Sequence, residues 1–397
     1  MSIPPNAPIG PWPKGINNVN DVSMLPPGCL QSAMNVLLDS GGVATPREGY
    51  SFLSAGAHSL FEFNGRHYGV LNNMVCEFTD VGARAMYGPI TGTVTWTVLN
   101  NEPLFVSNAV LGRVSNDRVM LIGVEEPGAV YVSPGQHADA LEFVGGIPVG
   151  IRKLGMFYMA CSFVSEDGEE GPLSAAYAAT SITVPLPLDS IIKRARVYQT
   201  NDEGDVLYEL TETIPGATVA VDTTRERFGR QADTQYKSRM IGGAYARYWR
   251  GRLLVARGRT LYFSEPLRYG LYDRSSGHVT FEARIDFIEP VAGGIFVALK
   301  GLGVRFLAGD TPGKWEQRVA TPVPAQPGTS MTVPAVQMKI EMQNPPDWVA
   351  VWFSTNGFVV GLPTGELYYP QEDHLSGLPL GSGAIFFEGD RLTVLSQ

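Results

Sequence analysis

One short pattern recurs along the chain and limits the folds open to it. Each copy has a Gly, a run of mostly apolar residues, a turn containing Gly or Asn, and a second run of apolar and aromatic residues. In four copies, the opening Gly and a matching residue of the second run lie ten positions apart. These copies are "GRHYGVLNNMVCEF" from Gly65, "GRLLVARGRTLYF" from Gly251, "GIFVALKGLGVRF" from Gly294 and "GFVVGLPTGELYY" from Gly357.

Each copy predicts a β-hairpin, because Gly and Asn supply the positive φ of tight turns and the flanking residues favour strands. One hairpin cannot bury its apolar face alone, but repeated hairpins can stack radially as the blades of a β-propeller. An ordinary sandwich with similar hairpins is the alternative. A looser copy from Asn101 and a truncated one from Gly389 predict about six blades. We expect the ring to close by pairing of residues 43–53 beside residues 384–396.

The composition suits an all-β chain. The 397 residues include 45 Gly and 29 Pro, and only 17% are charged, which is typical of short strands joined by tight turns. The net charge of −9 gives no general case for nucleic acid. Cys29, Cys76 and Cys161 are far apart and odd in number, so we expect small core residues. No apolar stretch reaches about 18 residues, and the start lacks a secretory pattern, so we expect no membrane span and folding in a reducing cytoplasm.

The pattern changes between about Lys153 and Thr223. There, strand-like runs alternate with turn signals over about seventy residues and resemble a small immunoglobulin- or fibronectin-III-like sandwich. We therefore expect four parts. They are an N-terminal extended arm with a short helix over 28–38 (1–42), a first part of the propeller (43–152), the inserted sandwich (153–223) and a second part of the propeller with ring closure (224–397).

No motif predicts catalysis, and we expect no enzyme and no catalytic, cofactor-binding or metal-binding residues. The five His are scattered, and the sequence has no metal-binding His pair, nucleophile elbow, P-loop or dinucleotide-binding Gly motif. The acidic turn "SEDGEEGPLS" lacks EF-hand spacing and favours a solvated turn over a calcium site. A glycan-binding or glycan-cleaving (depolymerase-like) propeller stays open as an alternative, and cleavage would need two facing carboxylates.

A basic segment interrupts this acidic chain. From Arg225 to Arg274 there are eleven Arg and one Lys against four acidic residues, a net charge of +8 that leaves −17 for the remainder. Strand alternation would place some of these Arg on an exposed face. The segment could dock on an acidic partner, form a nucleic-acid groove, or be a solvated face with Arg stems packed between blades. The candidate interface residues are Arg247, Arg250, Arg252, Arg257 and Arg259.

The N-terminal stretch resembles a known family. From Lys14 to Tyr50 the chain reads "KGINNVNDVSMLPPGCLQSAMNVLLDSGGVATPREGY", with a Gly-hydrophobic-Asn-Asn start, a Leu-Pro-x-Gly turn, an Ala-x-Asn-Val segment and an Arg-x-Gly-Tyr end. This pattern is similar to the opening of tailed-bacteriophage β-propellers of the tail hub or nozzle (tail tubular protein B-like) and of related minor tail proteins. The residues that carry it include Gly15, Asn17, Asn18, Gly28, Asn35, Arg47 and Gly49.

The resemblance implies a non-enzymatic structural protein of the virion, assembled in the host cytoplasm and located in the tail. Copies, expected to be six, would form a ring below the portal and adaptor proteins, or at the tail tip of a long-tailed phage. Genomic DNA would pass through the channel without sequence-specific binding, and tail fibres or other tail proteins would attach to the ring. Residues 1–22 would form an extended arm that lies on a neighbour or partner.

Overall fold

The structure is a computed structural model in which the chain is all-β, and the described part holds no α-helix. Two short 3-10 turns are present, η1 (Val22–Met24) and η2 (Ala335–Met338). The structure describes residues 13–33, 36–38, 41–46, 55–134, 139–144, 147–153, 156–201, 204–224, 228–338, 345–379, 381–388 and 391–396.

The helix expected over residues 28–38 is wrong. The described part of this range contains a turn at Gly28, an isolated parallel bridge between Ile16 and Leu30, and the strand β1 (Val36–Leu38). The Leu30 backbone donates to the Gly15 carbonyl oxygen at 2.8 Å and accepts from the Asn17 amide at 2.7 Å. Backbone groups paired in this way are not free for the i to i−4 bonds of a helix.

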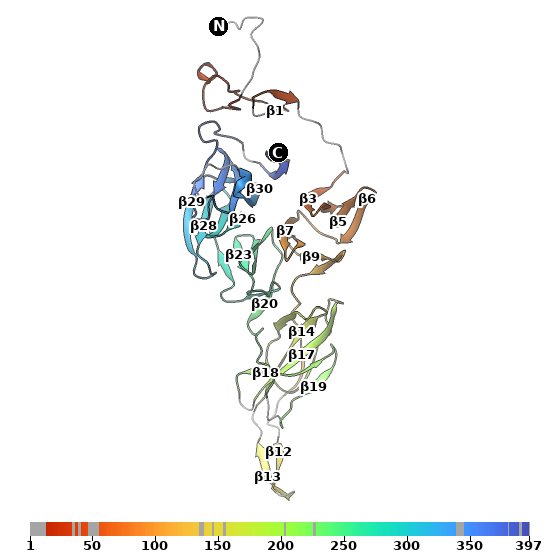
Figure 1. Cartoon of the computed structure of the whole chain (residues 1–397). Coiled ribbons are helices and arrows are strands. Elements are labelled where there is room, and N and C mark those ends of the chain that lie inside the picture. Colours follow the sequence, from red (N-terminus) through yellow and green to blue (C-terminus); the bar gives the residue numbers. More distant parts are fainter. Residues whose placement is uncertain are drawn as a thin grey trace.

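Five four-stranded antiparallel sheets of the described chain form the blades of a β-propeller (Figure 1). The fold class is the predicted one, but about six blades were expected. In the described chain, residues 391–396 of the truncated last copy belong to a two-stranded sheet and not to a sixth blade. The blades are β3 (His58–Phe63), β4 (Arg66–Leu71), β5 (Met74–Thr79) and β6 (Gly82–Tyr87); β7 (Thr95–Leu99), β8 (Glu102–Val106), β9 (Leu111–Ser115) and β10 (Arg118–Leu121); β21 (Tyr245–Trp249), β22 (Arg252–Arg257), β23 (Thr260–Phe263) and β25 (His278–Thr280); β26 (Ile285–Val291), β27 (Gly294–Leu299), β28 (Gly303–Ala308) and β29 (Glu316–Thr321); β30 (Ala325–Pro334), β31 (Trp348–Ser354), β32 (Gly357–Gly361) and β33 (Leu367–Tyr368).

Successive blades bury their apolar faces against one another. The first strands pack in sequence, with β3 against β7, β7 against β21, β21 against β26, and β26 against β30. Each hydrophobic cluster between them joins residues of two blades, so no sheet has to bury its face alone. Residues that share such a cluster are Tyr68 with Phe105, Leu104 with Leu253, Leu254 with Ile295, and Phe296 with Trp352.

The recurring sequence pattern forms the second and third strands of four blades and the third and fourth strands of the fifth. The four copies form the hairpins β4–β5, β22–β23, β27–β28 and β32–β33, and the looser copy forms β8–β9. Positive φ occurs at the turns as expected, for example at Asn72 (50°) and Asn73 (61°) between β4 and β5. The hairpin prediction is therefore confirmed for all five copies.

The expected ring closure is not seen in the described residues. The strand β2 (Ala44–Pro46) pairs with β1 in a separate two-stranded sheet, so the predicted pairing is wrong for this part of residues 43–53. Residues 47–53 lie outside the described residues. At the other end, β34 (Gly383–Glu388) pairs with β35 (Arg391–Ser396), and β34 lies against β30 of the fifth blade.

An inserted module separates the second blade from the third, and it begins earlier than residue 153. Its sheet of seven strands already includes β11, which pairs with β16, so the predicted boundary between propeller and insert is wrong. The hairpin of β12 and β13 extends from the far end of the module (Figure 1). The strands are β11 (Tyr131–Pro134), β12 (Asp139–Val144), β13 (Ile147–Lys153), β14 (Tyr158–Ser165), β15 (Glu170–Leu173), β16 (Tyr177–Thr183), β17 (Ile192–Thr200), β18 (Leu207–Thr213) and β19 (Thr218–Ala220).

The module returns to the propeller through a short two-stranded sheet of β20 (Lys237–Arg239) and β24 (Leu271–Asp273). At this junction the backbones of Gly123 and Gly270 come very close, because a Cβ on Gly270 would lie 2.5 Å from the Gly123 Cα. Only glycine permits such an approach. None of the described helical turns is long and apolar enough to cross a membrane.

Candidate functional site

A buried ion-pair network ties three blades together near the propeller axis. Arg247 on β21 donates to both carboxylate oxygens of Glu289 on β26, at 3.1 and 2.7 Å. The hydroxyls of Ser330 and Thr332 on β30 donate to the same carboxylate at 2.8 and 2.9 Å. Glu289 is fully buried, so this carboxylate has four protein hydrogen bonds in place of water. Arg247, a predicted interface residue, is thus engaged inside the fold.

An aromatic pocket of about 710 Å³ lies over this network, where the first strands converge. Residues from all five blades line it, and Trp348 at the start of β31 is 52% exposed. Among the described residues of the lining, Asp347 is the acidic one. Flat aromatic faces with a few polar groups suit a ligand that has both apolar and hydroxyl surfaces. The aromatic residues of the lining are Phe61, Trp96, Tyr248, Trp249 and Trp348.

The other four Arg predicted as an interface divide into two groups. Arg250 pairs with Asp310 at 2.8 Å and lies over the Trp249 ring, and Arg252 donates to the Ser264 carbonyl oxygen at 2.5 Å. Both are thus engaged within the blades. Arg257 and Arg259 are exposed at the turn between β22 and β23. The interface hypothesis therefore narrows to these last two residues.

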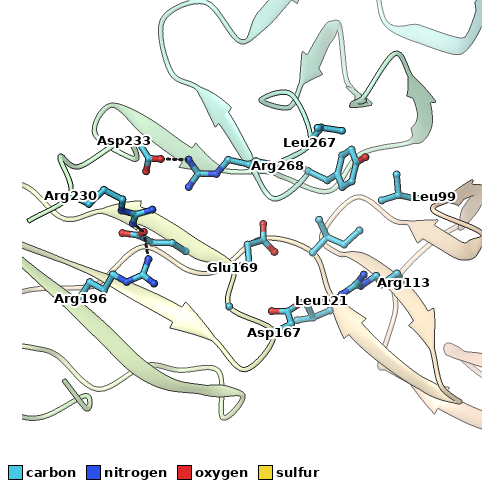
Figure 2. Close-up of a pocket in the computed structure, with 14 residues that line it drawn as sticks. Leu99, Arg113, Leu121, Asp167, Glu169, Arg196, Arg230, Asp233, Leu267 and Arg268 are labelled. Carbon is cyan, nitrogen blue, oxygen red and sulfur yellow. Dashed lines mark hydrogen bonds and ion pairs between the residues drawn. The ribbon is translucent and has the colours of Figure 1, made fainter. Parts of the chain in front are cut away.

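A second pocket, of about 560 Å³, lies at the junction of the propeller and the inserted module. Figure 2 shows Glu169 in the middle of it, between the Arg196 and Arg230 side chains and the Arg113–Asp167 pair. The Arg113 guanidinium lies 3.0 Å from the Asp167 carboxylate. The acidic turn predicted to be solvated thus partly lines an interdomain pocket.

The junction changes the pKa of Glu169. Burial raises the pKa of its carboxyl, and the neighbouring Asp167 raises it further, while Arg113 and Arg268 act in the opposite direction. A folded-state pKa above the ordinary value of 4.5 means that the ionised carboxylate is disfavoured in the fold. Its cost is therefore absent at low pH and appears as the pH rises through the folded-state pKa.

Replacing Glu169 by Gln should accordingly raise the free energy of unfolding at pH 7, because the neutral amide removes the buried charge. The gain should shrink as the pH falls toward 4.5, where the wild-type carboxyl is protonated. Urea unfolding from pH 4 to pH 8 measures this difference. Glu166→Gln, at an exposed residue of the same turn, is the control and should be as stable as wild type at pH 7. Equal stability of Glu169→Gln and wild type at pH 7 would contradict the expectation.

The residues of the N-terminal resemblance build a compact clasp, here defined as residues 13–31. Asn17 is buried, and its side-chain oxygen accepts from the Val19 and Asn20 amides, both at 3.1 Å. Asn18 exchanges two side-chain hydrogen bonds with the Ser376 backbone, at 3.0 and 2.9 Å.

The positive φ that favours glycine is found at Gly15 (72°) and Gly28 (85°). Asn35, Arg47 and Gly49 lie outside the described residues. The described part of the expected arm, residues 13–22, therefore contacts its own chain, through Asn18 with His374 and Ser376.

The three cysteines are buried and unbonded to one another, as predicted for core residues. Burial raises the pKa of the Cys161 thiol to about 11, so it is not a reactive thiolate at neutral pH. Within the part of the chain that the structure describes, no group of three or more His, Cys, Asp or Glu residues could hold a metal ion.

Sequence reasoning missed Glu289 and the aromatic lining, and it wrongly placed Glu169 in a solvated turn. A signal existed for Glu289, since "RIDFIEPV" places an acid inside an otherwise apolar strand, and such acids are usually paired. The sequence contains no such signal for the aromatic lining, because its residues come from strands that are far apart in the sequence.

The protein is thus a β-propeller with an inserted β-sandwich, and the two pockets are its candidate sites. No protein-family model matches the chain. No curated protein matches it either.

Solved structures similar to this chain include BBS1N, described in complex with ARL6DN, with 12% identity over 88% of this chain and 91% of that chain, at a TM-score of 0.33. The extracellular domain of the putative one-component system BT4673 from B. thetaiotaomicron shows 10% identity over 87% and 38%, at a TM-score of 0.32. The designed protein Ika8 shows 10% identity over 86% and 98%, at 0.25. TM-scores of this size do not establish a shared fold, so the propeller assignment rests on the strand order given above.

Proposed function

We propose that this protein is a non-enzymatic structural component of a tailed-phage virion, where copies of it form a ring in the tail nozzle or hub. The observation that carries the proposal is the N-terminal clasp. The pattern residues Gly15, Asn17, Asn18 and Gly28 are the ones that bend the clasp, hold it and fasten it to the segment before β34. The residue pattern of the phage resemblance thus corresponds to one defined structural unit.

The architecture fits a ring subunit in a second respect. The propeller and the inserted module follow one another along the molecule, and the β12–β13 hairpin extends the module further (Figure 1). A subunit with two separate bodies offers different surfaces to its two neighbours, as a heterologous ring contact requires. Adaptor proteins, tail fibres and DNA passing through the channel are the partners of this proposal, and the virion tail is its location.

The test uses particles produced from the genome that encodes this chain, together with the purified protein. We expect mass spectrometry to find the chain in purified virions, and electron cryomicroscopy to place it as a ring on the tail axis. Light scattering of the purified chain should give a mass several times that of the 43.0 kDa protomer. A chain that is absent from particles and monomeric at all concentrations would contradict the proposal.

The axial aromatic pocket favours a second candidate, a propeller that binds glycans. Trp348, Tyr248 and Trp249 could stack on sugar rings, and Thr97, Thr332 and Asp347 could bond hydroxyl groups. A glycan array with the Trp348→Ala variant as control tests this candidate. Binding that depends on Trp348 would support it, and a blank array would count against it.

A further inference from the structure

Four basic side chains from three separate segments meet on one surface of the propeller. Arg257 and Arg259 flank the turn between β22 and β23, Arg284 precedes β26, and Lys300 follows β27; all four are exposed. We call this group the basic patch.

Backbone hydrogen bonds hold the three segments of the patch side by side. The Phe281 amide donates to the Arg259 carbonyl oxygen at 2.8 Å, and the Ile285 amide donates to that of Gly258 at 2.9 Å. The Lys300 amide donates to the Arg284 carbonyl oxygen at 2.8 Å. The patch is therefore a fixed feature of the adjoining blades, although Arg284 and Lys300 are distant from the basic segment of the sequence.

The positive charge of the patch is not balanced nearby. The structure describes no ion pair for Arg257, Arg259 or Lys300, and Arg284 approaches the buried Asp286 at 3.8 Å. The adjacent Glu282 already forms an ion pair with Arg305, at 2.5 Å. Arg284 and Lys300 both lie near the one buried carboxylate of Asp286, and Arg257 and Arg259 have no ion pair among the described contacts. The patch thus keeps an excess of positive charge, which favours a negatively charged partner.

An exposed apolar residue beside the patch favours a protein partner over nucleic acid. Leu302 is 42% exposed, two positions after Lys300. Arg residues next to an apolar anchor are typical of protein interfaces, whereas contacts with phosphate need no apolar side chain. Arg257 and Arg259 can each hold a carboxylate with two parallel hydrogen bonds.

The inserted module of the same protein carries the complementary charge. From Tyr158 to Ala220 there are ten acidic and three basic residues. The propeller holds its own module through other contacts, including Arg113 with Asp167 at 3.0 Å. Exposed acids such as Glu166 and Asp205 have no ion pair among the described contacts, so a second copy can meet them.

We propose that the basic patch of one copy docks on the acidic inserted module of the next copy. This inference rests on the proposed ring and identifies its contact. Patch and module are different surfaces, so the contact is heterologous and can close a ring by rotation. The contact should weaken with salt, because its charges lie at an exposed rim.

The experiment is sedimentation velocity of the full chain at low and high salt. The patch variants are Arg257→Glu/Arg259→Glu and Arg284→Glu/Lys300→Glu. The control, Arg118→Glu/Arg318→Glu, changes the net charge by the same amount at exposed Arg residues elsewhere. We expect each patch variant to weaken self-association at least about tenfold, and the control to behave as wild type. Mixing the Arg257→Glu/Arg259→Glu chain with a Glu166→Lys/Asp205→Lys chain should restore association, since the charges are then exchanged.

The outcomes separate the contact from the ring itself. If the patch variants assemble as well as the wild type, the proposed contact is wrong, but the proposed ring is not contradicted. A wild-type chain that never associates would overturn both. Fluorescence anisotropy with a labelled DNA duplex measures whether the same variants change nucleic-acid binding. Duplex binding that is lost in the patch variants, while self-association persists, would assign the patch to nucleic acid and overturn the inference.

Discussion

Replacing Glu289 by Ala is expected to lower the free energy of unfolding of the propeller by about 3–5 kcal/mol, because it leaves the buried Arg247 guanidinium without its counter-charge. The same change removes the acceptor of Ser330 and Thr332, so two hydroxyls on β30 lose their partner. Urea unfolding followed by tryptophan fluorescence measures the change, because Trp96 and Trp249 lie on strands next to the network.

Two further variants show that the charge itself causes this loss. The double variant Arg247→Met/Glu289→Leu removes both charges and should recover most of the stability, since apolar residues can replace a buried pair at little cost. Glu316→Ala breaks the exposed pair with Arg318 and should leave the unfolding midpoint unchanged. A Glu289→Ala chain as stable as Glu316→Ala would show that the network does not stabilise the blades.

The second large effect is expected at Glu170, in the core of the inserted module. Its carboxylate is 4% exposed, pairs with Arg196 at 2.6 Å and with Arg230, and accepts from Tyr198 and Ser162. Glu170→Ala should destabilise the module by about 3 kcal/mol, toward the lower end for a broken buried pair because Arg230 is half exposed. Hydrogen exchange of β14 and β17 measures the effect, because these paired strands hold much of the core of the module.

The pH dependence gives Glu170 an independent test. Burial acts to raise the pKa of its carboxyl, but the hydrogen bonds from Tyr198, Ser162 and Arg196 outweigh it and lower the pKa below 4.5. A lowered pKa stabilises the fold above the unfolded value, and this stabilisation is lost as the pH falls. The difference between wild type and Glu170→Ala should therefore narrow below pH 4.5. Glu212→Ala removes a partly exposed carboxylate that pairs with Arg194 at 3.0 Å and with Arg196 at 3.4 Å, and it should cost at most about 1 kcal/mol at pH 7.

Much of the fold could be predicted from the sequence, because hairpins are local. The spacing between Gly65 and Val75, and its repeats, depends on a turn and two flanking strands that lie next to one another in the chain. Strand pairing across longer distances carries no such signal. The sequence therefore predicted one hairpin of each blade correctly but not the start of the inserted module, where β11 pairs with the distant β16.

The candidate site was less predictable for a related reason. Arg247 and Arg257 look alike in the sequence, since both alternate with apolar residues. The Arg247 side chain is 15% exposed and is paired with Glu289 of the next blade, whereas Arg257 is exposed at a turn. The difference depends on packing between blades, which single-strand alternation does not contain. Of the basic patch, the sequence indicated only Arg257 and Arg259. Arg284 and Lys300 are distant in the sequence and are brought beside them by backbone hydrogen bonds.

The position of the inserted module also sets the order in which the chain can fold during synthesis. The hydroxyl of Thr95 in the second blade donates to the carbonyl oxygen of Ala244 before the third, at 2.6 Å, and 149 positions separate them. At about 5–20 residues per second, the ribosome needs roughly 7–30 s to make this stretch. During this time the first two blades have left the ribosome and have one apolar face uncovered, while the inserted module can form its own core. A cell that makes this protein must shield that half-finished face until the third blade arrives.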